Sequence, residues 1–183
     1  MWNPRLQDVN KILVTGLIGS GKSEVCSYLA GQGYPVYDSD RATKLLYETI
    51  PGLKAEVERA IGRPFSEIGS IFSDFSARNE LEALVYPLVK ADFRRFAASC
   101  GAETVFFESA VAYGKAQFKG EFDKVVLVRA PYEVRLGRNP KVAQRDAAQQ
   151  EMPLEEADYI IENNSGLQEL HDQVKEMIKT FKI

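Results

Sequence analysis

One glycine-rich segment constrains the fold of this chain more than any other part of the sequence. Residues 16–23 read Gly-Leu-Ile-Gly-Ser-Gly-Lys-Ser and satisfy the pattern G-x-x-x-x-G-K-[ST]. The short β-branched run at 12–15 precedes them, and apolar residues recur at helical spacing from Lys22 onward. Glycines let successive backbone N–H groups turn inward around an anion, and a helix N-terminus adds partial positive charge. The sequence therefore predicts a phosphate-binding loop between a strand and a helix.

The chemistry of this loop assigns roles to its residues. Lys22 can reach the terminal phosphates of a nucleotide, and the hydroxyl of Ser23 can ligate Mg²⁺. The alternative is a glycine-rich turn that only caps a helix, which the flanking strand and helix disfavour. The residues expected to bind the nucleotide are Gly16, Ile18, Gly19, Ser20, Gly21, Lys22 and Ser23.

Strand and helix signals alternate along the rest of the chain. The continuous apolar run at 124–128 is typical of a parallel strand covered on both faces. Further strands are predicted at 35–37, 104–107 and 159–161, and helices at 41–47, 53–61, 78–99 and after a capping-box pattern at 165–168. Pro87 is expected to bend the helix at 78–99. The pattern favours an α/β fold of the P-loop NTPase type, with a doubly wound parallel sheet of about five strands.

The 183 residues fit one domain over 1–183. Two segments lie outside the alternating order. The helical stretch at about 41–100 is predicted to be an insert that binds an acceptor substrate. The Arg- and Gln-rich stretch at about 138–151 is predicted to be a short lid.

The composition of the chain excludes several classes of binding partner and indicates a cellular compartment. The net charge is −3, so no global field draws the chain to nucleic acid or to a membrane surface. Two cysteines without CxxC spacing and a single histidine exclude a Cys/His zinc cluster and a disulfide scaffold. The start at 1–5 leads into an apolar run that is too short for a signal peptide or a membrane span. We expect a cytoplasmic protein with a small-molecule substrate.

Two carboxylates follow the second predicted strand. Asp38 and Asp40 lie at its carboxyl end, where open α/β sheets bind their ligands. One of them could bind Mg²⁺ or deprotonate an acceptor hydroxyl; the alternative is that one caps the helix that begins near 41. In an extended segment two such residues project to one side at different depths, which places Asp40 nearer the mouth of the crevice.

Further polar residues stand at predicted strand ends. Glu108 follows the apolar run 105–107 and either supports the magnesium shell or is a solvated strand end; both readings are open. Arg135, Arg138 and Arg145 follow the fourth strand, where guanidinium groups suit phosphoryl oxygens, although a solvated helix face would carry the same residues. Cys26 and His171 are expected to pack rather than to react.

Four segments in this order resemble the dephospho-CoA kinase family. Residues 15–23 are similar to the family's T-G-G-I-G-S-G-K-S, and residues 33–40 to its G-x-x-V-x-D-A-D. Residues 84–89 match a segment that usually reads I-x-H-P-x-V, and residues 157–163 its A-D-x-V-I-x-N. The resemblance runs from about Lys11 to the last helix. It implies a P-loop kinase that uses ATP and Mg²⁺ to phosphorylate the ribose 3′-hydroxyl of dephospho-CoA, the last step of coenzyme A synthesis.

The resemblance also assigns residues. It makes Asp40 the catalytic aspartate, with Asp38 in support, and places the metal at Ser23 and Asp40. Lys22 and Arg138, the preferred lid arginine, complete the catalytic set. The residues assigned to acceptor binding are Asp38, Lys44, Tyr86 and Glu108.

The chain departs from the family's pattern at several places. Lys44 stands where the family commonly has Arg, and Tyr86 replaces the His before Pro87. The family's R-x-x-x-Q run is matched by Arg145 and Gln149, in a lid segment shorter than usual.

Other functions fit part of the pattern. Another P-loop kinase, for a nucleoside or nucleotide, would share the loop and the carboxylates. A nucleotide-hydrolysing switch or binding protein would need no acceptor, but the chain has no [NT]-K-x-D guanine motif. A degenerate kinase kept as a binding module is suggested only by Tyr86, Lys44 and the short lid. The sequence does not indicate an oligomeric state.

Overall fold

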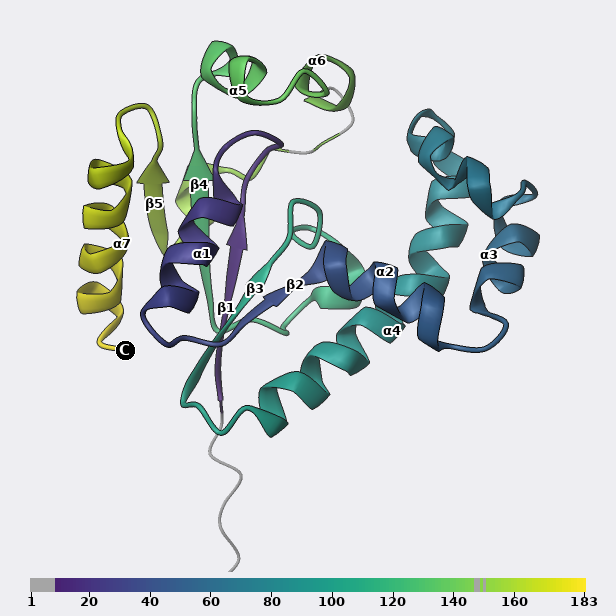
Figure 1. Cartoon of the computed structure of the whole chain (residues 1–183), viewed down its shortest axis with the longest axis horizontal. Helices are drawn as coiled ribbons and strands as arrows, with labels where there is room; N and C mark the ends of the chain where they lie inside the picture. Colours follow the sequence, from purple (N-terminus) through teal and green to yellow (C-terminus); the bar gives the residue numbers. More distant parts are fainter. Residues whose placement is uncertain (1–8, 147–148, 150) are drawn as a thin grey trace, which may run out of the picture.

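Five parallel strands form one sheet at the centre of the computed structural model, which describes residues 9–146, 149 and 151–183 (Figure 1). The strands are β1 (Asn10–Thr15), β2 (Val36–Asp38), β3 (Thr104–Glu108), β4 (Lys124–Arg129) and β5 (Tyr159–Glu162). Their order across the sheet is β2-β3-β1-β4-β5, and all neighbours are parallel. The predicted doubly wound sheet of about five strands is confirmed. The expectations for residues 1–5 lie outside the described residues.

Register brings the functional strand ends together. Val14 of β1 is paired with Glu108 of β3, and Glu108 is paired in turn with Asp38 of β2. On the other side of β1, Thr15 is paired with Leu127. The phosphate-binding loop therefore leaves the sheet at the same edge as both carboxylates, because the carboxyl ends of parallel strands coincide.

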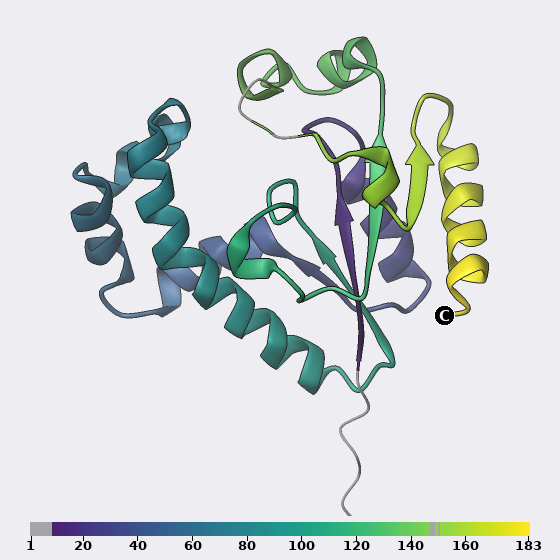
Figure 2. The same cartoon turned by 180° about the vertical axis from the view of Figure 1, so that it is seen from behind.

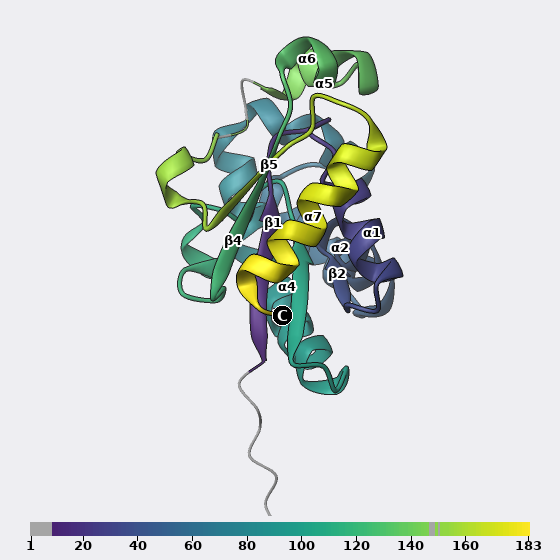
Figure 3. The ribbon, with the colours of Figure 1, turned by 90° about the vertical axis from the view of Figure 1, so that its left-hand side faces the viewer.

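Helices cover both faces of the sheet. Alternate residues of a strand point to opposite faces, so Ile12 and Val14 face one layer while Leu13 faces the other. Helices α1 (Lys22–Gly31) and α7 (Leu167–Phe181) pack on the first face, as Figure 3 shows edge-on. The second face packs against α4 (Phe75–Ser99), whose Phe93 is fully buried.

The segment between β2 and β3 forms the helical insert. It consists of α2 (Ser39–Thr49), α3 (Leu53–Ile61), the 3₁₀ helix η1 (Phe65–Ser73) and α4. In Figures 1 and 2 its α3 end stands beyond the β2 edge of the sheet, and α4 leads back to the sheet. Helix α4 continues through Pro87, and its axis changes direction part-way along its length (Figure 2), which suits an internal proline.

The remaining connections lie around the carboxyl edge of the sheet. Helices α5 (Tyr132–Arg138) and α6 (Val142–Arg145) stand over the end of β4 (Figure 1). The 3₁₀ helices η2 (Ala116–Phe118) and η4 (Leu154–Glu156) precede β4 and β5. Among the described residues no helix is both long and apolar enough to cross a bilayer.

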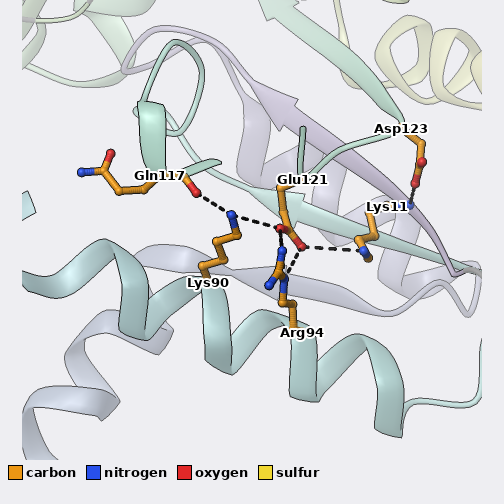
Figure 4. A network of polar contacts seen from close by, with 6 residues as sticks. All are labelled: Lys11, Lys90, Arg94, Gln117, Glu121 and Asp123. Carbon is orange, nitrogen blue, oxygen red and sulfur yellow. Dashed lines mark hydrogen bonds and ion pairs between the residues drawn. The ribbon is translucent and has the colours of Figure 1, made fainter. Parts of the chain in front are cut away.

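A buried carboxylate fastens α4 to the sheet (Figure 4). The side chain of Glu121 is 1% exposed, and both of its oxygens accept hydrogen bonds from Arg94, the shortest at 2.7 Å. Lys90 of the same helix lies 3.4 Å from Glu121, and Lys11 of β1 lies 3.7 Å away. One carboxylate thus joins the helix, the first strand and the β3–β4 connection.

Two helix starts differ from the sequence predictions. Helix α2 begins at Ser39, two residues early, because the side chain of Asp38 caps it. Helix α4 begins at Phe75 because Asp74 is its N-cap and accepts a hydrogen bond from the N–H of Ala77 at 3.1 Å.

The capping box predicted at 165–168 is wrong. Gly166 is the N-cap of α7, and no side chain caps this helix. The helix is held instead by its apolar stripe, in which Leu170, Val174 and Met177 are buried against the sheet. Tertiary packing of this kind fixes the position of a helix without a cap.

Candidate active site

Close approach of neighbouring atoms, backbone in one case and a side chain in the other, explains two glycines of the phosphate-binding loop. Gly16 has φ +146°, and a Cβ there would lie 2.1 Å from the carbonyl oxygen of Val128. Gly21 has φ +101°, and a Cβ there would lie 2.0 Å from Nδ2 of Asn163. Any other residue at these positions would both strain the backbone and collide. The loop conformation therefore depends on β4 and on the end of β5 as well as on its own sequence.

Lys22 is a buried cation inside this loop. Its side chain lies along the loop, with the residue 9% exposed, and Nζ donates to the carbonyl oxygens of Gly16 at 2.8 Å and Leu17 at 3.2 Å. Burial lowers the pKa of the ammonium, while the negative charges of Glu108 and Asp40 act in the opposite direction. The site thus holds one positive charge that donates to two backbone carbonyl oxygens and is favoured by two carboxylates.

Ser23 and Glu108 are in direct contact. Ser23 Oγ donates to Oε1 of Glu108 at 2.7 Å, across the gap between α1 and the end of β3. A hydroxyl beside a carboxylate, with Asp40 near enough to act on the same lysine, is a set of hard oxygen donors of the kind that Mg²⁺ prefers. These residues therefore fit a magnesium ion. Cys26 lies next to them, and burial raises the pKa of its thiol well above the usual range, so it stays a packing residue.

Asp38 and Asp40 have different surroundings. Oδ1 of Asp38 accepts a hydrogen bond from the N–H of Arg41 at 2.9 Å, so Asp38 is a helix cap, one of the two roles considered for it. Asp40 is exposed in the first turn of α2. The expectation that both project from an extended segment is wrong, because the early start of α2 turns Asp40 onto a helix. Its negative charge raises the pKa of Lys22, against the effect of burial, and raises the pKa of Tyr86.

The two residues that depart from the family's pattern, Lys44 and Tyr86, lie on two helices of the insert. Lys44 is exposed on α2, one turn after Asp40. Tyr86 lies on α4, with its ring 5.5 Å from that of Phe118. Burial, then the charge of Glu82 and a hydrogen bond to it, raises the pKa of the Tyr86 phenol. Tyr86 is therefore a neutral hydrogen-bonding group at physiological pH.

The arginines after β4 divide into two kinds. Arg135 is buried, and its guanidinium pairs with Asp146 while Nε donates to the carbonyl of Ala130 at 3.1 Å. Arg138 is exposed and reaches the phosphate-binding loop, with Nη1 3.5 Å from the carbonyl oxygen of Gly19. Arg145 is only partly buried. Arg135 thus links α5 to Asp146 and also donates from Nη1 to the carbonyl oxygen of Ile18 at 3.4 Å, so Arg135 and Arg138 both reach the loop.

Asn163 was predicted only as the last residue of the segment 157–163 that is similar to the family's pattern, with no role of its own. Its Nδ2 donates to the carbonyl of Ser20 at 2.8 Å, and its Oδ1 and backbone oxygen accept from Nη2 of Arg138 at 3.2 and 3.1 Å. Asn163 therefore connects the loop to Arg138. Its place at the carboxyl end of the last strand was the signal that could have identified it.

Gln149 also contacts the loop. Its Oε1 accepts a hydrogen bond from the backbone N–H of Ile18 at 2.8 Å. This N–H is one of the donors expected to face phosphate, so a side chain from the predicted lid segment satisfies it here. Residues 147, 148 and 150 of that segment lie outside the described residues.

Comparison with known proteins fixes the family. The family model for dephospho-CoA kinase matches residues 11–169. The chain belongs to the dephospho-CoA kinase family. A dephospho-CoA kinase of Mesorhizobium japonicum is 31% identical over 186 residues, which cover 90% of this chain and 93% of that protein. The resemblance inferred from four short segments is confirmed, and the chain is a P-loop kinase.

Solved structures support the same fold. TT1252 of Thermus thermophilus is 31% identical and superposes with a TM-score of 0.75, covering 94% of this chain and 97% of that one. The dephospho-CoA kinase of Campylobacter jejuni shares the fold, with a TM-score of 0.59 at 16% identity over 94% of this chain and 96% of that one.

Proposed function

We propose that this chain transfers the γ-phosphoryl group of ATP to the ribose 3′-hydroxyl of dephospho-CoA, giving coenzyme A and ADP. The observation that carries the proposal is the position of Asp40. It stands in the first turn of the insert, and its charge acts both on Lys22 of the phosphate-binding loop and on Tyr86 of the insert. A carboxylate between a phosphate site and an acceptor site is placed to receive the proton of the attacking hydroxyl.

The other residues neutralise charge and position the reactants. Phosphoryl transfer needs little covalent chemistry from the protein, so alignment and electrostatics dominate. The Lys22 ammonium exchanges its contacts with Gly16 and Leu17 for phosphate oxygens, and Arg138 adds positive charge from the lid side. Ser23 and Asp40 would hold Mg²⁺, with Glu108 supporting Ser23. When bound, the ion would screen the negative charge of the phosphates.

Asp38 takes a structural part in this proposal. It orients the first turn of α2 and so sets the direction of Asp40. Lys44 and Tyr86 contribute to the acceptor side. The two cysteines form no disulfide, which suits a reducing cytoplasm.

A coupled ADP-release assay tests the reaction. Dephospho-CoA should be turned over with Mg²⁺ and ATP, and the product should co-elute with coenzyme A. Nucleosides and nucleotides as acceptors should give little ADP. ADP release that is equally fast without an acceptor would indicate a nucleotide-hydrolysing switch instead, and preference for a nucleoside would indicate a different kinase.

Substitution of the two aspartates tests the roles. Asp40→Asn keeps the size of the side chain and removes its basicity, so kcat should fall about 100-fold or more while ATP affinity, measured by titration, changes little. Asp38→Asn is the matched control, because asparagine also caps helices and turnover should stay near normal. The roles are reversed if Asp38→Asn is the inactive variant.

A further inference from the structure

A polar stripe on α4 runs from the insert toward the sheet. Arg78, Glu82 and Tyr86 are spaced four residues apart, and Lys90 and Arg94 continue the series. Residues at this spacing lie on one side of a helix. Each successive member from Glu82 on meets the β3–β4 connection, at Lys115, Phe118, Gln117 and Glu121. Lys90 and Arg94 fasten the helix beside the sheet, and Glu82 and Arg78 continue the stripe toward the N-terminus of α4.

At this N-terminal end of the stripe two cations share one carboxylate. Nζ of Lys115 lies 2.7 and 2.9 Å from the oxygens of Glu82, and Nε of Arg78 lies 3.8 Å from Oε1. The side chain of Glu82 is 13% exposed, while those of Arg78 and Lys115 are 25% and 28% exposed. The cluster therefore keeps one surplus positive charge at a partly solvated position.

Arg78 also has a donor without a partner. Its Nε is buried and makes no hydrogen bond within the part of the chain that the structure describes. Its guanidinium is placed by the ring of Phe75, 5.6 Å from the centroid. The Arg78 side chain as a whole is 25% exposed, so the guanidinium can offer its other N–H groups to the acceptor oxygens of a ligand.

The cluster stands beside the proposed reaction centre. The Tyr86 hydroxyl lies within the electrostatic reach of Asp40, Glu82 and Arg78 together. An α-helix rises 1.5 Å per residue, so Glu82 and Arg78 lie about 6 and about 12 Å along the axis from Tyr86. In dephospho-CoA the diphosphate is attached to the 5′-carbon of the ribose whose 3′-hydroxyl is phosphorylated. A ribose at Asp40 would therefore direct its diphosphate along this stripe.

We propose that Arg78 and Lys115, held by Glu82, bind the diphosphate of the acceptor. The inference rests on the proposed function, since it takes the acceptor to be dephospho-CoA. The planar guanidinium offers paired N–H donors to phosphate oxygens, and the ammonium of Lys115 adds a mobile point charge from a different segment of the chain. Glu82 keeps both cations in place before the acceptor arrives, and the site selects for acceptors that carry a diphosphate.

Steady-state kinetics of Arg78→Gln and Lys115→Met test this site. Loss of one charge-assisted contact should raise the KM for dephospho-CoA about tenfold to a hundredfold. The kcat and the KM for ATP should change by less than about threefold, because neither residue contacts the phosphate-binding loop. Lys119→Met, an exposed lysine in the same connection, is the matched control and should behave like wild type. Arg78→Lys keeps the charge and should recover part of the affinity.

Salt dependence separates ligand binding from a structural role. An attraction between cations and a diphosphate weakens with ionic strength, so kcat/KM for dephospho-CoA should depend less on salt in Arg78→Gln than in wild type. An unchanged KM and salt slope in both variants would show the site to be wrong, as would a parallel loss for ATP and acceptor. A wild-type chain that does not phosphorylate dephospho-CoA contradicts the proposed function itself, whereas an active wild type with unaffected variants contradicts this site alone.

Discussion

Lys22 carries a positive charge in a position where solvation by water is almost lost. The carbonyl oxygens of Gly16 and Leu17 replace that water, and two carboxylates nearby favour the charged form. Both carbonyl contacts come from the loop that is to receive phosphate. The ammonium can therefore exchange the two carbonyl oxygens for phosphate oxygens with only small movements of the side chain. A charged group that is already in place before the ligand binds is the preorganisation that electrostatic catalysis requires.

Removal of this ammonium should abolish most of the activity and leave the fold intact. For Lys22→Ala we expect kcat to fall about 100- to 1000-fold, because one group that stabilises developing charge is lost. Circular dichroism should match wild type, because the sheet and α1 are held by apolar contacts. Lys22→Arg is the matched variant that keeps the charge, and it should restore little, since a planar fork cannot replace a compact ammonium. A folded Lys22→Ala with turnover close to wild type would contradict the role.

How well single residues can be predicted depends on whether their partners are close in sequence. The loop residues 16–23 were predictable because their function follows from local backbone geometry. Asp38 and Asp40 were predicted as a pair with two possible roles. Only the hydrogen bond from the N–H of Arg41 identifies Asp38 as the helix cap and so leaves the role of general base to Asp40. Glu82, Lys115 and Asn163 were not predictable, because the Glu82–Lys115 pair spans 33 residues and Asn163 bonds Arg138 and Ser20, which are 25 and 143 residues away.

At the scale of elements, the segment after β4 has contacts that join its own helices and contacts that join it to the phosphate-binding loop. Arg135 ties α5 to Asp146 beyond α6, so the two short helices are linked. Arg135, Arg138 and Gln149 all contact the phosphate-binding loop directly. Since Gln149 satisfies a backbone donor that phosphate would also use, nucleotide binding has to rearrange this contact.

Hydrogen exchange tests whether this segment closes over the ligands. Peptides from 132–146 should exchange more slowly when ATP and dephospho-CoA are both present than with either alone. If the ligands stabilise the closed arrangement by about 1.4 kcal/mol, the rate falls roughly tenfold. A peptide from α7 serves as the internal reference and should not change. The same exchange without ligand, with ATP alone, with dephospho-CoA alone and with both would mean that the segment is not a lid.

Elements were predictable in kind but not at their ends. Apolar periodicity located all five strands and the long helices, because a buried face must repeat with the period of its element. The starts of α2 and α4 were displaced by the aspartate caps Asp38 and Asp74. The false capping box at 165–168 shows the converse, since a local pattern yields to packing of the whole helix on the sheet.

At the scale of the whole molecule, Glu121 connects parts that have to move as one. It joins α4 to β1 through Arg94, Lys90 and Lys11, so the insert is anchored to the strand that carries the phosphate-binding loop (Figure 4). Burial alone would raise the pKa of this carboxyl, but the hydrogen bonds and charges of Arg94, with Lys11 and Lys90, outweigh burial and lower it below its ordinary 4.5. The interaction is therefore a source of stability that depends on pH.

Glu121→Gln should lower the free energy of unfolding by about 1–3 kcal/mol at pH 7. Breaking a fully buried ion pair costs more than this, because it leaves an uncompensated buried charge. The loss is smaller here because the side chains of Arg94, Lys90 and Lys11 are partly exposed and stay hydrated without Glu121. Urea titration measures the loss, and Glu103→Gln, an exposed carboxyl before β3, is the matched control. An equal stability of wild type and Glu121→Gln at pH 7 would show that the ion-pair network contributes nothing net.

The pH dependence of this loss has a definite sign. Because the pKa of Glu121 is lower in the folded than in the unfolded chain, the unfolded chain binds the proton first as pH falls. The stabilisation is fully present above the unfolded value of 4.5 and is lost as pH falls through the folded value. The difference in unfolding free energy between wild type and Glu121→Gln should therefore be constant from pH 7 to about pH 5.5 and shrink below about pH 4.5. A difference that stays constant into acid would mean that the carboxylate charge is not what joins α4 to the sheet.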